Sequence, residues 1–172
     1  MRCHVLRGRA LPVVLVFALA CTIFTASAAE GAVAAASVSC PQVSTTTGDV
    51  SPPPAPGVDW AGCNLVGAKI ESANMTGADL AQADLYFAYF GDTDLSGTSF
   101  AGANVGYAGF SQDNLTSADL SSTRLNDAGM SIVDLAGANF SGADMSLLDA
   151  EQVAGSPVGL PPDWQLNGKF AV

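Results

Sequence analysis

The chain has 172 residues and carries 16 acidic against 6 basic side chains, which gives a formal net charge of −10 at pH 7. Such a balance repels nucleic-acid phosphates and anionic membrane surfaces, and it favours basic partners. We therefore expect no nucleic-acid partner.

Residues 1–28 have the organisation of a secretory signal peptide. Three arginines precede an apolar run over 11–24, and Ala-Ser-Ala follows at 26–28. An uncleaved membrane anchor is one alternative, but the run contains a proline and is shorter than a spanning helix needs. A lipoprotein site at Cys21 is another, although the apolar run continues past it.

Removal of this segment would leave only Lys69, Arg124 and Lys169 against sixteen acidic residues, a formal charge of −13, and no histidine. We expect the remaining chain to be secreted, at the cell surface or in the cell envelope. We also expect it to make no stable membrane insertion once the signal peptide is gone.

Residues 29–57 are rich in Ala, Ser and Thr and end in a proline-rich run. This composition cannot bury a core, so it predicts a flexible linker. After export, Cys40 in this linker and Cys63 would be the two remaining cysteines, and an oxidising setting favours a disulfide between them. The alternative is a free Cys40 and a buried thiol at Cys63.

From Cys63 to Met145 the residue type depends on position modulo five, over seventeen consecutive blocks. One position per block is always large and apolar, the position two before it is Ala in eleven blocks, and the position between them is Asn or Asp in eleven. A period of five fits neither a helix nor a simple strand. Each block can bury its large and small residues only if the chain coils and successive coils stack.

Residues 73–77 (Ala-Asn-Met-Thr-Gly), 78–82 (Ala-Asp-Leu-Ala-Gln) and 138–142 (Ala-Asn-Phe-Ser-Gly) resemble the unit of pentapeptide repeat proteins, in their exported bacterial form. The resemblance implies an all-β fold, a right-handed quadrilateral β-helix over 58–150 with about four coils. Four blocks per coil would stack residues twenty apart, for example Phe90 on Phe110.

Both ends of such a coil need a cover, because an open end exposes apolar side chains and unpaired backbone groups. We expect Trp60 to close the first coil. Residues 151–172 are expected to form a C-terminal cap. An uncovered end would allow a homodimer through the coil end. The side chains expected to form the cap are Leu160, Trp164, Leu166 and Phe170.

Three places depart from the repeat. Asp113 occupies a small inward position, so either the backbone bulges there or the carboxylate accepts hydrogen bonds from neighbouring turns. Gly109 and Gly129 replace Asx in one column, which we attribute to backbone geometry. Four aromatic residues at outward positions form the third departure.

These aromatic residues predict an exposed patch, because Phe87 and Tyr107 are twenty residues apart and would be neighbours on adjacent coils. Such patches often mark interaction sites. The alternatives are that the linker or cap covers the rings, or that they pack against one another. The predicted binding patch consists of Tyr86, Phe87, Tyr89 and Tyr107.

The composition offers little for catalysis, because the exported chain would lack histidine and nearly all Lys and Arg. We expect no enzyme activity, no catalytic residues, no cofactor and no metal site. The sequence therefore favours a non-enzymatic exported binding or structural module with an unknown protein or glycan partner. The alternative is a DNA mimic acting on a type II topoisomerase, which the resemblance implies for some members of the family.

Overall fold

The computed structural model of the chain describes residues 39–162 and residue 164. The signal peptide expected over 1–28 and the linker residues 29–38 lie outside the described residues. Within the described ranges, no helix has the length and apolar character needed to cross a membrane.

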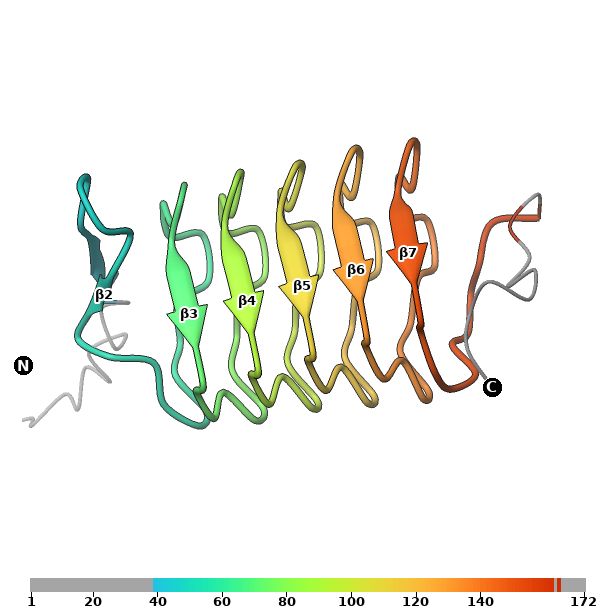
Figure 1. Ribbon diagram of the computed structural model, residues 1–172, viewed down its shortest axis with the longest axis horizontal. Helices are drawn as coiled ribbons and strands as arrows, with labels where there is room; N and C mark the ends of the chain where they lie inside the picture. The colour runs from blue at the N-terminus through green and yellow to red at the C-terminus, as the bar shows by residue number, and fades with distance from the viewer. Residues whose placement is uncertain (1–38, 163, 165–172) are drawn as a thin grey trace, which may run out of the picture. The chain divides into compact units, whose positions relative to one another are not determined.

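The described residues form two β-sheets and no helix (Figure 1). Two antiparallel strands come first, and five parallel strands follow in chain order, one in each successive coil. The bounds are β1 Gln42–Val43, β2 Val50–Ser51, β3 Lys69–Glu71, β4 Tyr89–Gly91, β5 Gly109–Ser111, β6 Gly129–Ser131 and β7 Asp149–Glu151. Each residue of a parallel strand pairs with the residue twenty positions later, in the next strand, as Phe90 does with Phe110.

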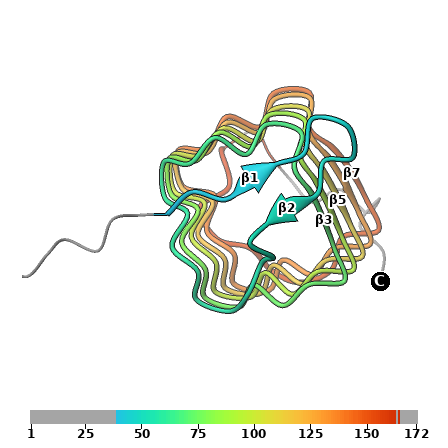
Figure 2. The same ribbon diagram turned by 90° about the vertical axis from the view of Figure 1, so that its left-hand side faces the viewer.

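The other three sides of the coil are held by single parallel bridges with the same spacing, for example Asn64 with Asp84, Asn74 with Asp94 and Asp79 with Ser99. Seen along its axis, the coil has four sides (Figure 2). The quadrilateral all-β coil predicted from the sequence is confirmed.

The chain turns because one residue in every five has a left-handed backbone. Every fifth residue from 57 to 152 has a positive φ, and twelve of them are not glycine. The Asn or Asp of each block stabilises this turn by accepting the N–H two residues on, as Asp79 Oδ1 accepts that of Ala81 at 2.9 Å. All eleven Asn and Asp residues at this position of the repeat make this bond.

The Asx side chains also connect successive coils. Asn104 Nδ2 donates to Asp84 Oδ1 at 2.9 Å, and Asn114 Nδ2 donates to Asp94 Oδ1 at 3.1 Å. An amide opposite a carboxylate therefore gives Asp84, Asp94 and Asp119 a donor from the next coil, where a second carboxylate would repel them.

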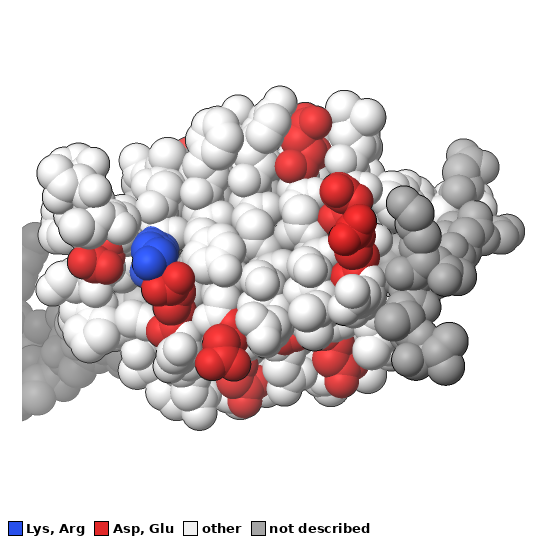
Figure 3. All heavy atoms as spheres, viewed as in Figure 1, with Lys and Arg blue, Asp and Glu red and all other residues white. Residues whose placement is uncertain are grey.

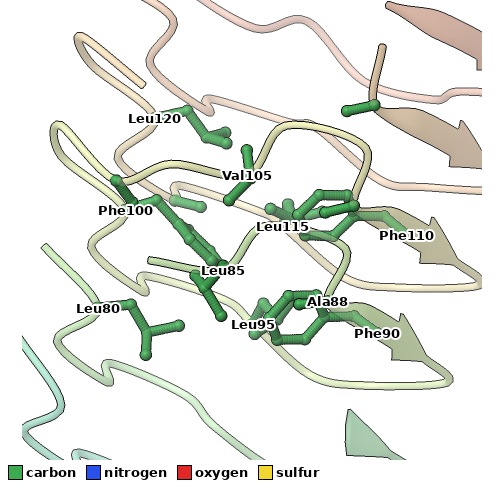
Figure 4. Close-up of a cluster of buried hydrophobic side chains, with 14 of the residues drawn as sticks. Leu80, Leu85, Ala88, Phe90, Leu95, Phe100, Val105, Phe110, Leu115 and Leu120 are labelled. Atoms are coloured by element: carbon green, nitrogen blue, oxygen red, sulfur yellow. The ribbon is translucent and has the colours of Figure 1, made fainter. Parts of the chain in front are cut away.

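The core is a stack of the large apolar residues, and all seventeen are buried. The rings of Phe90 and Phe110 stack with centroids 5.0 Å apart, and Phe100 meets both edge-on (Figure 4). The inward threonines satisfy their hydroxyls on the backbone, as Thr98 does by donating to Met75 O at 2.9 Å. The core therefore fills the coil from side to side.

Within the described part of the expected linker, residues 39–57, strands β1 and β2 pair as a β-hairpin across the open N-terminal end of the coil (Figure 2), where the composition predicted a flexible segment. Val43 and Val50 pack against the core, and Lys69 N–H donates to Gly48 O at 2.8 Å. Composition failed to predict this order because it comes from contacts with distant residues. Trp60 is buried in the core at the N-terminal end of the coil, which the hairpin covers, as expected.

The disulfide predicted between Cys40 and Cys63 is present, with the two Cα atoms 5.4 Å apart. Cys63 is buried at an inward small position of the first coil. The bond therefore ties the start of the hairpin directly to the core.

The coil also runs beyond its expected end. Strand β7 crosses the boundary set at residue 150, and bridges from Asp134 to Ala154 and from Asn139 to Val158 extend the coil pattern. Leu160 and Trp164 then pack on the last coil, whereas Leu166 and Phe170 lie outside the described residues. The coil-end homodimer stays a prediction.

The turn geometry predicts that Ile132→Gly stabilises the protein. Ile132 is β-branched, has φ +59° and is 51% exposed, so it carries backbone strain with little packing in return. We expect the free energy of unfolding to rise by about 0.5–1 kcal/mol in chemical denaturation. Gly77 has φ +65° and open space around it, so the reverse change Gly77→Ala should lower stability by about 1 kcal/mol. A loss of stability with Ile132→Gly together with a gain with Gly77→Ala would contradict the turn geometry.

Removing the disulfide with the pair Cys40→Ser and Cys63→Ala should lower the free energy of unfolding by about 3 kcal/mol on the chain-entropy model. The bond closes a loop with a sequence separation of 23, and alanine is the usual residue at the position of Cys63. Hydrogen exchange should show faster exchange at Ser44 and Lys69, whose amides bond within and to the hairpin, while Leu115 stays protected. Unchanged exchange at Ser44 and Lys69 would mean that the other contacts of the hairpin hold it in place without the disulfide.

Candidate binding surface

Three aromatic side chains meet at the corner of the coil that precedes β4 and β5. The ring centroids of Tyr86 and Phe87 are 4.5 Å apart, those of Tyr86 and Tyr107 5.4 Å, and those of Phe87 and Tyr107 5.2 Å. Phe87 is 58% and Tyr107 45% exposed. We call these three residues the aromatic corner. They pack against one another and still present a large apolar surface to solvent.

The backbone at this corner is strained. Phe87 has φ +58° and Tyr107 φ +56°, and the same place in the preceding coil is Gly67. A bulky residue in the left-handed region costs about 1 kcal/mol or more relative to glycine. Glycine at both positions would carry less backbone strain.

Neighbouring residues orient the corner. Gly106 leaves room for the Tyr86 ring, since a Cβ at Gly106 would lie 3.2 Å from Tyr86 Cδ2. A hydrogen bond to Asp127 and the charge of that carboxylate raise the pKa of the Tyr107 hydroxyl. The corner therefore combines an apolar surface with a hydroxyl and a carboxylate at its edge.

Tyr89, the fourth residue of the predicted patch, lies elsewhere. It begins β4, is 39% exposed, and its ring covers Gly91 and Gly109 on the outer face of the parallel sheet. A Cβ on Gly91 would come within 2.9 Å of the Tyr89 ring. The structure thus brings together three of the four predicted residues and places the fourth on the strand face.

Sequence reasoning did not identify a cleft between the hairpin and the first coil. This open cleft of about 920 Å³ is lined by hydroxyls of the loop 44–47 and by Asn64, Val66, Lys69 and Tyr89. Lys69 is paired with Glu71 at 2.7 Å, so the cleft offers no unpaired cation. The sequence held no signal for the cleft, because the hairpin that forms one wall was not predicted.

Asp113 is buried, with 3% of its surface exposed, and the register on either side of it is kept. Its Oδ1 accepts the N–H of Thr93 and its Oδ2 that of Ser111, both at 2.8 Å. Of the two sequence alternatives, the hydrogen-bonded carboxylate is therefore correct and the bulge is not. Burial raises the pKa of Asp113 to about 6, a rise that the two N–H donors oppose and the charge of Asp92 increases.

Metal-ligating side chains do not gather in the described part of the chain, where no three His, Cys, Asp or Glu residues stand close enough to hold an ion. The Asx carboxylates are instead spread along the corners of the coil, where they accept hydrogen bonds from the turns.

A family profile of pentapeptide repeats matches the chain in eight copies, over residues 57–85, 63–102, 78–112 and 114–147, which together cover just over half of it. No curated protein matches the chain by sequence.

Solved structures of pentapeptide repeat proteins resemble the chain. A protein from the thylakoid lumen of Arabidopsis thaliana is 23% identical, with a TM-score of 0.54, over 60% of this chain and 72% of that one. HetL, involved in heterocyst differentiation regulation in Nostoc sp. strain PCC 7120, is 25% identical, with a TM-score of 0.48. The match covers 58% of this chain but only 54% of HetL. The plasmid-mediated fluoroquinolone resistance protein QnrB1 is 16% identical, with a TM-score of 0.38, over 57% of this chain and 60% of QnrB1. These likenesses concern the fold.

The raised pKa of Asp113 predicts a pH-dependent stability. The folded protein holds this proton more tightly than the unfolded chain, so the contribution of Asp113 to stability is present below about pH 4 and is lost as the pH rises to about 6. The loss should be on the order of 2 kcal/mol.

The measurement is the difference in unfolding free energy between the native protein and Asp113→Thr, from pH 3.5 to 7.5. Threonine occupies the same column one coil earlier, at Thr93, and does not titrate, so the difference isolates Asp113. It should fall with rising pH and level off above 6. A difference that is flat over this range would show that the carboxyl has an ordinary pKa.

Proposed function

The chain belongs to the pentapeptide repeat family, and on that premise we propose that it is an exported, non-enzymatic binding module whose aromatic corner holds a protein or glycan partner. The observation that carries the proposal is the placement of Phe87 and Tyr107 at left-handed turn positions with about half of each side chain exposed. The packing of the rings on one another offsets part of the backbone cost at these two positions, but glycine would carry no such cost. A binding role supplies a reason for both rings.

The contacts of the aromatic corner support binding in a second way. Because the three rings pack on one another, they lose little side-chain entropy when a partner covers them. The hydroxyl of Tyr107, whose pKa the nearby Asp127 carboxylate raises, provides a polar group beside the apolar surface. Rigid aromatic side chains with a polar edge are typical of binding hot spots.

Two features support export. The organisation of residues 1–28 is that of a signal peptide, and the disulfide between Cys40 and Cys63 suits an oxidising compartment. Outside the reducing cytosol this disulfide would stay formed and would keep the hairpin attached to the first coil. The module would therefore work at the cell surface or in the cell envelope.

The second candidate function is that of a DNA mimic acting on a type II topoisomerase. The acidity of the chain supports it. The Asx carboxylates, however, have a structural reason to be present, because each accepts a turn N–H. Acidic character at these positions is thus a consequence of the repeat.

Replacement of the aromatic corner tests the proposal. Phe87→Gly with Tyr107→Gly removes two rings and relieves two strained turns, so the protein should fold at least as stably as before. We expect the native protein to co-sediment with the cell-envelope fraction of the producing organism and the double variant to lose at least tenfold in affinity. Protease or glycosidase treatment of the envelope identifies the class of partner.

Ile132→Gly is the matched control, since it removes an exposed apolar side chain from the same turn position on another corner. It should bind like the native protein. Equal binding by all three proteins would rule out the aromatic corner. Retention of the protein in the cytoplasm, together with inhibition of DNA supercoiling by a purified topoisomerase, would favour the DNA mimic.

A further inference from the structure

The outer face of the parallel sheet carries glycines at the ends of three strands. Gly91 ends β4, whereas Gly109 and Gly129, which pair with each other, begin β5 and β6. None of them has a positive φ, so a left-handed backbone does not explain them. Glycine weakens a strand and often marks a place where a ligand or another chain approaches closely.

The Tyr89 ring accounts for two of these glycines. A Cβ at Gly91 would meet the ring at 2.9 Å and one at Gly109 would meet it at 3.2 Å, so both must be small for the ring to lie on the sheet. Around Gly129 there is nothing within 4 Å of the place a Cβ would occupy. No internal contact therefore requires glycine at 129, and a β-branched residue would suit the strand better.

The surface is hollowed at this place. A shallow groove of about 240 Å³ runs over Gly109 and Gly129 and is lined by Tyr89, Ser131, Asp149 and Glu151. At the spacing of paired strands, the floor from β5 to β7 is about 10 Å long. This length suits one extended Lys or Arg side chain.

The charges around the groove are of one sign. Acidic side chains gather on the strand face towards its C-terminal end, and the middle of the face carries no charge (Figure 3). Among the described residues neither Asp149 nor Glu151 takes part in an ion pair, whereas Glu71 at the other end is neutralised by Lys69. The groove therefore has an aromatic ring at one end and, at the other, two carboxylates that pair with no cation in the described ranges.

We propose that this strand-face groove binds a Lys or Arg side chain from an extended segment of a basic protein partner. The aliphatic stem lies on the glycine floor against Tyr89, and the cationic head reaches Asp149 and Glu151. Long basic side chains bury their stems on apolar surface in this way while the head stays polar. The net charge of −10 steers such a partner towards the protein.

The inference is independent of the aromatic corner, because it rests on a different face and on different residues. Gly129→Val is the informative variant. Its Cβ meets no neighbour and valine has a higher strand propensity, so the fold should be kept or stabilised while the groove is filled.

The experiment is a fluorescence-anisotropy titration at low salt, with a fluorescein-labelled peptide of alternating Thr and Arg as the probe. The same peptide with citrulline in place of arginine is the uncharged control. We expect the Arg peptide to bind the native protein at least tenfold more tightly than the citrulline peptide, and to lose at least tenfold with Gly129→Val. Glu151→Gln with Asp149→Asn should give a similar loss, which tests the groove even if the valine variant does not fold.

Asp79→Asn with Asp119→Asn is the matched control, since it removes the same number of charges from another side of the coil and keeps the oxygen that accepts each turn N–H. This control should bind within twofold of the native protein, as should Phe87→Gly with Tyr107→Gly. Equal losses in both pairs of carboxylate variants would mean that the peptide responds only to overall charge, and full binding by Gly129→Val would mean that the groove is not used. Either result overturns the proposal.

Discussion

The left-handed turn at every fifth residue is the constraint on which the rest of the structure depends. It bends the chain four times in twenty residues, so that the chain returns to the same side and pairs with itself in parallel. An Asn or Asp side chain stabilises most of these turns by accepting the N–H two residues on. Because only the large and small residues then point inward, a core forms from blocks that could bury nothing alone.

This geometry separates the needs of the fold from those of the surface. Four positions of each block serve the coil: the large and the small inward residue, the Asx and the left-handed residue. Residues that depart from the repeat at these positions therefore stand out. Phe87 and Tyr107 depart where glycine would be less strained, and Gly129 departs where a larger residue would strengthen its strand. The first departure adds apolar surface to a corner, and the second removes a side chain from a face. Both are easier to explain by contact with a partner than by packing within the chain.

The sequence predicted what local repetition determines. The twenty-residue register, the buried column with Phe90 on Phe110 and the bond between Cys40 and Cys63 are all found in the structure. The hairpin over 39–57 was not predicted, because Val43 and Val50 become ordered only through distant contacts with the first coil. The position of the Tyr89 ring on the strand face was not predicted either: it lies over Gly91, two residues on, and over Gly109, twenty residues on. The pattern gives the register of the repeats, but it gives neither the contacts of the hairpin nor the direction in which an outward ring lies.

A nuclear Overhauser spectrum of the purified protein tests the turn and its register most directly. The account predicts cross-peaks between the ring protons of Phe90 and Phe110, together with the strong intraresidue amide-to-Hα cross-peak of a positive φ at Gln82, Gln112 and Ile132. Absence of contact between the two phenylalanine rings, or cross-peaks of helical spacing through the repeats, would contradict it.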